Sequence, residues 1–320
     1  MLTAPNGAVG RLLAQMSALL PGNRTLVIGN LPLDVLPIVA ALPWQACTNL
    51  CVSPDGGRRT PIAPPAWPRL RRLIIGLCTA EQAVETLACF TTASLASLTI
   101  LADEPRPADD PAFDEDDIFG PLMALAGAHA NLVELHVSAK VTRPPLALSG
   151  RLLTPLVGCT RMRTLAFAYG IANGHPATPR LGLAAIHLLA SAWPQLTEFI
   201  VCHPYGSLPG CAYSAGIAPA GVDLGVIHVL QTKCPLLRTL QLVECAPGSL
   251  VAGRRRDLRH ITVRVLCTRT SVPSTLKSLI KTIWPQATVW VDASADTQGW
   301  NVLQTTRMTT ELRSHTGLDW

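Results

Sequence analysis

The chain has 320 residues, a formal net charge of +5 and 15% charged residues, and 48% of its residues are hydrophobic. No stretch has the pattern of a membrane span, because the long uncharged runs at residues 35–54 and 199–222 are broken by Pro, Gly or amide side chains. The first residues lack a basic region followed by an unbroken apolar core, so no secretory signal is predicted. We therefore expect a cytoplasmic or nuclear protein whose ten cysteines are reduced thiols.

The first 20 residues predict a capping helix, because apolar residues from Val9 to Leu20 recur at helical spacing. Residues 21–295 then repeat a motif in which an apolar residue is followed by two residues of any type, an apolar residue, one of any type and another apolar residue. Its last two apolar positions alternate as in a strand with one buried face. The clear copies are Leu70-Leu73-Ile75, Leu95-Leu98-Ile100, Leu132-Leu135-Val137, Met162-Leu165-Phe167, Leu196-Phe199-Val201 and Leu237-Leu240-Leu242, and the weaker ones are Cys47-Leu50-Val52 and Leu258-Ile261-Val263.

Helices are predicted between these strands, over Ala80–Leu95, from Asp116 or Asp117 through Ala128, over Leu181–Ala192 and over Val222–Gln231. Short strands that alternate with helices at a repeating interval are typical of a solenoid. The fold class predicted is therefore α/β, with about nine to ten irregular strand–helix repeats and a parallel sheet on the concave face.

The repeat interval varies from 21 to 41 residues, and the long intervals require insertions. Three insertions are predicted, near residues 103–117, 170–180 and 203–222. The first holds eight of the 21 acidic residues, which favours either a solvated loop or an element that docks a basic partner. After a last strand at Val289 and Val291, residues 296–320 show no periodicity and predict an irregular tail or cap.

The segment CPLLRTLQLVEC, from Cys234 to Cys245, resembles the cysteine-containing leucine-rich repeat, and WPRLRRLIIGLC, from Trp67 to Cys78, is similar. The resemblance implies a horseshoe-shaped solenoid. Repeats of this type also resemble the substrate-binding half of F-box proteins, which implies a substrate receptor of a cullin-type ubiquitin ligase with a Skp1-like adaptor as partner. Leu31-Pro32 looks like the opening of an F-box within residues 31–45, but the match fails from Leu42 onward, so the F-box is either missing or highly divergent.

The residues on either side of the buried strand positions predict the recognition surface, because alternate side chains of a strand point to opposite faces. This surface is extended and chemically mixed, which favours a non-enzymatic protein–protein recognition module, monomeric outside its complex. The candidate partner-binding residues are Arg72, Glu134, His136, Glu198, Gln241, His260 and Arg264.

Catalytic, metal and cofactor sites are not predicted. The chain has no nucleophile elbow, phosphate-binding loop, dinucleotide fingerprint or zinc-protease motif, and its cysteines lack paired zinc spacing. His187 is interpreted as a hydrogen-bonded structural residue of an apolar helix. Cys51 and Cys202 are predicted to be the thiols most accessible to an alkylating reagent, because they fall on the exposed side of strands.

The positive charge is concentrated near the carboxyl end, where residues 246–320 hold ten Lys and Arg against five Asp and Glu. The densest cluster, Arg254, Arg255, Arg256 and Arg259, leaves binding of RNA or another polyanion as an alternative function. A solvated loop between repeats is the favoured interpretation, since no aromatic residues are interleaved with these arginines.

Overall fold

The structure is a computed structural model, and it describes residues 15, 24–32, 46–55, 69–91, 93–103, 116–141, 150–171, 183–202, 222–223, 225–243, 245–246, 262–266, 278, 280–282 and 284–292. All statements below concern these residues.

The fold is α/β, with one open ten-stranded sheet whose strands are parallel and neighbour one another in the order of the sequence. Two further strands, β8 (Val222–Asp223) and β10 (Cys245–Ala246), form a separate parallel pair that the sequence did not predict. The strands of the large sheet are β1 (Thr25–Pro32), β2 (Asn49–Asp55), β3 (Arg72–Cys78), β4 (Ser97–Asp103), β5 (Glu134–Val141), β6 (Thr164–Ile171), β7 (Glu198–Cys202), β9 (Thr239–Val243), β11 (Thr262–Leu266) and β12 (Thr288–Asp292).

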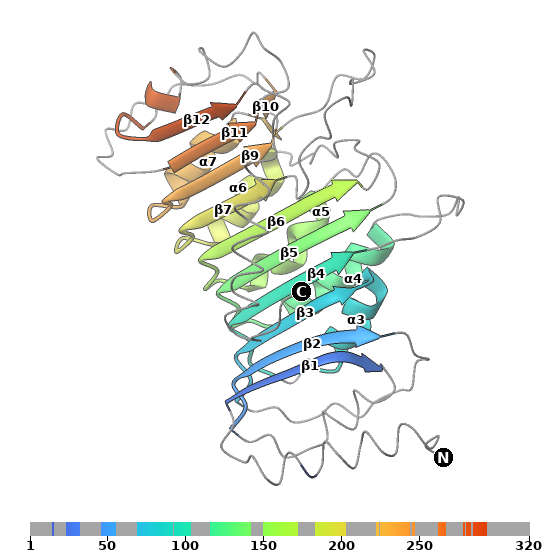
Figure 1. The fold of residues 1–320 in the computed structure, drawn as a ribbon. Coiled ribbons are helices and arrows are strands. Elements are labelled where there is room, and N and C mark those ends of the chain that lie inside the picture. The colour runs from blue at the N-terminus through green and yellow to red at the C-terminus, as the bar shows by residue number, and fades with distance from the viewer. Residues whose placement is uncertain are drawn as a thin grey trace.

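The helices lie together on one face of this sheet, which is the far face in Figure 1. We call the opposite face, which carries no described helix, the open face. The helices are α3 (Ala80–Ala88), α4 (Asp116–Gly127), α5 (Gly150–Leu153), the 3₁₀ helix η1 (Thr154–Gly158), α6 (Leu183–Ala192) and α7 (Gly225–Lys233).

The repeated apolar positions predicted from the sequence form two rows on the helix-covered face. Register pairs Leu50 with Leu73, Leu73 with Leu98 and Leu98 with Leu135, and so on across the sheet. Leu26, Leu50, Leu73, Leu98, Leu135, Leu165, Phe199 and Leu240 are all buried in one hydrophobic core. Each such side chain contributes about 1.5–3 kcal/mol relative to an exposed one, so the repeated motif fixes both the register and the buried face.

The motif copy predicted at Leu258-Ile261-Val263 lies two residues later in the structure than the sequence predicted. Val263, not Ile261, pairs with Leu240, and Val265 pairs with Leu242. The shift by two residues keeps the same face, because side-chain direction in a strand has a period of two. The strand predicted at Val289 and Val291 is confirmed as β12, which pairs with β11.

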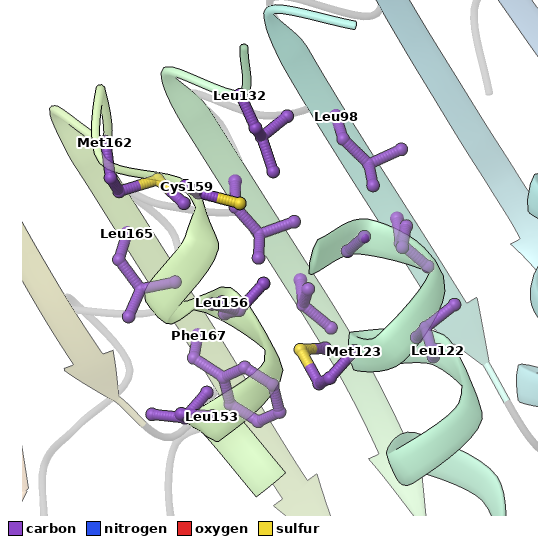
Figure 2. Close-up of a cluster of buried hydrophobic side chains, with 14 of the residues drawn as sticks. Leu98, Leu122, Met123, Leu132, Leu153, Leu156, Cys159, Met162, Leu165 and Phe167 are labelled. Atoms are coloured by element: carbon purple, nitrogen blue, oxygen red, sulfur yellow. The ribbon is translucent and has the colours of Figure 1, made fainter. Parts of the chain in front are cut away.

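The layer between helices and sheet is a packed core in which side chains from several units interdigitate. Figure 2 shows Leu122 and Met123 of α4 among the buried side chains, and Leu153 of α5 beside Phe167 of β6. The ring of Phe119 in α4 meets that of Phe167 edge-on, with centroids 6.3 Å apart. Because each helix also packs against its neighbour, the units bury one another's apolar surface.

The predicted helix over Ala80–Leu95 is confirmed only as α3, which ends at Ala88. Its start is fixed by a capping box, in which the Thr79 hydroxyl accepts from Gln82 N–H and the Gln82 side chain accepts from Thr79 N–H. Cys89 N–H turns back to the carbonyl of Thr86 at 3.1 Å, which tightens the last turn and stops the helix.

The apolar helix predicted over Leu181–Ala192 is confirmed as α6, but it is buried on one side only. Ile186, Leu189 and Ala190 are buried, but Leu183 and Leu188 are 42% and 47% exposed. His187 is exposed as well, and its backbone carbonyl accepts a hydrogen bond from the Ser191 hydroxyl at 2.7 Å, so its predicted role as a hydrogen-bonded structural residue stays a prediction. A helix in the outer layer of a two-layer fold keeps one side in water, whatever the residues on that side.

Several predictions fall outside the described residues. These are the capping helix at residues 1–20 apart from Gln15, the insertions apart from their ends, and the tail at residues 296–320. Leu31 and Pro32, the proposed opening of an F-box, lie at the end of β1, where they pair with Pro54 and Asp55 of β2.

Candidate functional site

Register places two rows of residues on the open face, on either side of the buried leucine positions. The first row is Thr25, Asn49, Arg72, Ser97, Glu134, Thr164, Glu198, Thr239, Thr262 and Thr288. The second row, two residues further along each strand, is Val27, Cys51, Ile74, Thr99, His136, Ala166, Ile200, Gln241, Arg264 and Trp290. The first row is entirely polar, and the second is apolar at its amino-terminal end.

Strand β5 supplies the most accessible part of these rows. Glu134 is exposed, and His136 and Ser138, which follow it on the same face, are half-buried. The flanking positions in the neighbouring strands, Thr99 and Ala166, are buried and have short side chains. A carboxylate, an imidazole and a hydroxyl therefore follow one another along the open face of this strand.

Strands β1 to β4 carry a second apolar cluster on the open face. Cys51 and Ile74, which pair in register, are each 4% exposed, and Val27 and Leu101 pack against them. The prediction that Cys51 is accessible was therefore wrong. Burial raises the pKa of its thiol to about 11, so little of it is in the reactive thiolate form at neutral pH.

The sheet brings most of the predicted partner-binding residues together. Arg72, Glu134 and Glu198 share the first row on β3, β5 and β7. The remaining predicted residues that are described, His136, Gln241 and Arg264, hold second-row register positions. Cys202, the other thiol predicted to be accessible, pairs in register with Ala168 on β6. His260 and the basic cluster Arg254, Arg255, Arg256 and Arg259 lie outside the described residues, so their predicted roles stay predictions.

Arg72 and Glu198 are half-buried, which leaves part of each charged side chain on the surface. Neighbouring strands lie about 4.8 Å apart, so two strands separate positions by roughly 10 Å. Arg72, Glu134 and Glu198 thus recur at every second strand. The row alternates a charged side chain with a short hydroxyl side chain, Ser97 or Thr164, over the whole stretch from β3 to β7.

Sequence reasoning missed His129, which lies at the end of the helix layer rather than on the open face. It is 3% exposed, and its Nδ1 lies 2.9 Å from the carbonyl oxygen of Ala93 in the preceding unit, to which it donates. Burial lowers the pKa of this histidine, opposed by that hydrogen bond, so it is held neutral. The signal in the sequence was its position, since His129 precedes Leu132 by three residues as Cys159 precedes Met162.

The residues at this position form a ladder of side-chain hydrogen bonds between consecutive units. Trp193 Nε1 donates to the carbonyl of Leu156 at 3.2 Å, and Cys234 Sγ lies 3.8 Å from the carbonyl of Ala190. Cys159 Sγ lies 3.6 Å from the carbonyl of His129. Cys159, Trp193 and Cys234 are all buried, and these contacts fix how one unit sits on the next.

Within the described ranges, no group of three or more His, Cys, Asp or Glu side chains is placed to hold a metal ion. None of the described helices has the length and apolarity needed to cross a bilayer. Compared with known proteins, the chain matches no protein-family model and no curated protein.

Proposed function

We propose that this chain is a non-enzymatic protein-recognition module of the leucine-rich-repeat type, which binds its partner with the open face of the sheet. The observation that carries the proposal is the first row of that face, where Arg72, Glu134 and Glu198 recur at every second strand in strict register. The row spans β3 to β7, so its groups are spread along the sheet and suit a large partner better than a small molecule.

The repeat character of the chain supports the same proposal. Two buried apolar positions recur in each strand from β2 to β6, and a helical segment follows each strand from β3 to β6. A stack of such units exposes one continuous sheet face, and the repeat class uses such faces for binding. We propose about nine to ten repeats, counted from the ten strands of the sheet.

The test is recovery of partners from the native cell type, with full-length wild-type protein and a charge-reversed variant compared side by side. The variant is Glu134→Lys with Glu198→Lys, both on the open face. The matched control is Glu81→Lys with Glu85→Lys, on helix α3 on the opposite side of the sheet. We expect the open-face variant to lose proteins that the wild type and the control both retain. Identical partners for all three proteins would contradict the proposal.

The alternative, an F-box-like substrate receptor of a cullin-type ubiquitin ligase, rests on the cysteine-containing repeats. The same purification decides it. Recovery of a Skp1-like adaptor together with a cullin supports the receptor role, and loss of both on deletion of residues 33–45 assigns the contact to the segment after β1. Recovery of other partners without those two leaves the plain recognition role.

A further inference from the structure

The turns that enter the strands form one continuous line along the amino edge of the sheet, where the strand tails lie in Figure 1. A chain of backbone hydrogen bonds links them, since the N–H of each turn residue donates to the carbonyl of its counterpart one strand earlier. The line runs through Arg24, Thr48, Arg71, Ala96, Val133, Arg163, Thr197 and Arg238. Its members are therefore held at fixed spacing by the sheet.

Four of these eight positions are arginines, and two more arginines precede two of them by two residues. We call the whole set the arginine edge, and every member of it is exposed. Its members are Arg24, Arg69, Arg71, Arg161, Arg163 and Arg238. The set belongs to the turns before β1, β3, β6 and β9, which are far apart in the sequence, so a linear view of the charge does not show it.

The spacing along the edge follows from the strand separation of about 4.8 Å. The arginines of β1 and β3 lie two strands apart, or roughly 10 Å, those of β3 and β6 roughly 14 Å, and those of β6 and β9 roughly 10 Å. The whole edge is thus about 34 Å long. Between the arginines stand the half-buried, uncharged residues Thr48, Ala96, Val133 and Thr197.

Acidic side chains close to this edge are few among the described residues. Glu134 and Glu198, which open β5 and β7, are the acids of the adjoining first row. At the opposite edge, Asp55, Asp103 and Asp292 end their strands. Among the described residues, arginines therefore outnumber carboxylates where the strands begin.

One guanidinium of the edge is already oriented. Arg71 Nη1 donates to the carbonyl oxygen of Ser94 at 3.0 Å, which ties its side chain along the turn before β4. The fork of a guanidinium has five donors, so this bond leaves others for a ligand. An arginine presented this way pairs with a carboxylate through two parallel hydrogen bonds.

We propose that the arginine edge docks an acidic segment of a polypeptide partner, by pairing its guanidiniums with Asp and Glu carboxylates. The spacing favours this class over duplex DNA: the edge offers one charge per roughly 6 Å, whereas duplex DNA carries one per about 1.7 Å. The turn residues along the line also include no aromatic side chain on which bases stack. The proposal deepens the recognition role proposed above but uses other residues, so each can fail alone.

The test measures binding of labelled poly-L-glutamate to the full chain by fluorescence anisotropy at low and moderate salt. The edge variant is Arg161→Gln with Arg163→Gln and Arg238→Gln, all exposed, so the fold is expected to persist, as circular dichroism can verify. We expect binding that weakens as salt rises, and an edge variant at least about fivefold weaker, since exposed ion pairs are individually modest.

A control removes two exposed charges outside the arginine edge, with Lys233→Gln and Lys281→Gln. Its affinity for poly-L-glutamate is expected to stay within about twofold of wild type. Equal loss in both variants, or no loss in the edge variant, overturns the proposal, because binding then follows net charge or another site. Tighter binding of single-stranded poly-U RNA than of poly-L-glutamate, lost in the edge variant, also overturns it in favour of nucleic acid.

If the edge variant loses poly-L-glutamate but keeps every natural partner that the open-face variant loses, the arginine edge is a separate docking surface. If the open-face variant binds poly-L-glutamate as wild type does yet loses its partners, the two surfaces act independently. The failure of one proposal is therefore distinguishable from the failure of the other.

Discussion

The close approach of helix α4 to the 3₁₀ helix η1 makes a sharp prediction about two glycines of the same helix. A Cβ atom built on Gly127 would lie 2.3 Å from the carbonyl oxygen of Pro155 and 2.8 Å from its carbonyl carbon. A Cβ on Gly120 would meet nothing within 4 Å. Gly127→Ala and Gly120→Ala therefore make the same chemical change in opposite surroundings.

Gly127→Ala forces α4 and η1 apart by about 1 Å, because the obstacle is backbone rather than a flexible side chain. Moving η1 also disturbs Leu156, which is fully buried and accepts the indole hydrogen of Trp193. Such overpacking costs about 1–3 kcal/mol. Gly120→Ala gains about 0.5–1 kcal/mol in helix propensity. Residue 120 directly precedes Pro121 in α4, and a Cβ before a proline is disfavoured in a helix, so little net change is expected.

Urea unfolding followed by circular dichroism measures both variants. At an m value of about 2–3 kcal/mol per molar, the midpoint of Gly127→Ala should fall by roughly 0.5–1 M, and that of Gly120→Ala should change by no more than a few tenths. An unchanged or raised midpoint for Gly127→Ala, at an unchanged m value, would refute the close packing of α4 on η1.

Three further predictions concern buried side chains. Acidification below pH 6.5, the ordinary pKa of histidine, should reduce the free energy of unfolding by up to about 1.4 kcal/mol per pH unit. The reason is that His129 has a lowered pKa in the folded protein, so the unfolded chain takes up the proton more readily. Urea midpoints measured against pH should therefore vary less in His129→Gln than in the wild type. Iodoacetamide at pH 8 should leave Cys51 unlabelled in the native protein and label it in urea. A pKa of about 11 makes its thiolate roughly a hundredfold rarer than that of a thiol with a pKa of 9. Labelling at equal rates in both states would contradict the burial of Cys51. Trp193→Phe should lower the free energy of unfolding by about 1–2 kcal/mol, because the indole hydrogen bond to the Leu156 carbonyl is lost. Chemical unfolding at constant pH measures this change. An unchanged free energy of unfolding would mean that the bond does not contribute to stability.

The strands and their register were predictable because period and spacing carry that information locally. Leu73, Leu98 and Leu135 each stand at the same place in an apolar motif, and the sheet pairs them directly. The error at Ile261 has the same origin. Where apolar residues continue with a period of two through Val263 and Val265, the motif fits equally well at either position, and only the pairing with β9 selects one.

The candidate surface was predictable in direction but not in exposure. Alternation placed Cys51 and Glu134 on the same face of the sheet, and that placement is correct. Cys51 is nevertheless buried, because its side chain is short and longer apolar neighbours on adjacent strands, such as Ile74, surround it. Exposure of this kind depends on the strands to either side, which lie more than 20 residues away in the sequence.

The arginine edge escaped prediction for a related reason. Each arginine occupies a turn position that has no obligatory residue type, so no motif marks it. Only the backbone hydrogen bonds from Arg163 to Val133, and from Arg238 to Thr197, place these turns in one line. Charge that is scattered in the sequence becomes a pattern when a parallel sheet stacks its turns.

The residue three places before the first apolar position shows what the repeat requires of its helix ends. This position is occupied by His129, Cys159 and Trp193 in three consecutive units. Their side chains differ greatly in volume, but each carries a hydrogen-bond donor. A helix leaves its last carbonyl groups without partners in the helix, and a buried carbonyl without a donor is costly. Each unit supplies a donor to the end of the unit before it, so the position selects for a buried N–H or S–H rather than for sulfur. The variation that makes the repeats look irregular in sequence is therefore compatible with one constant contact between units.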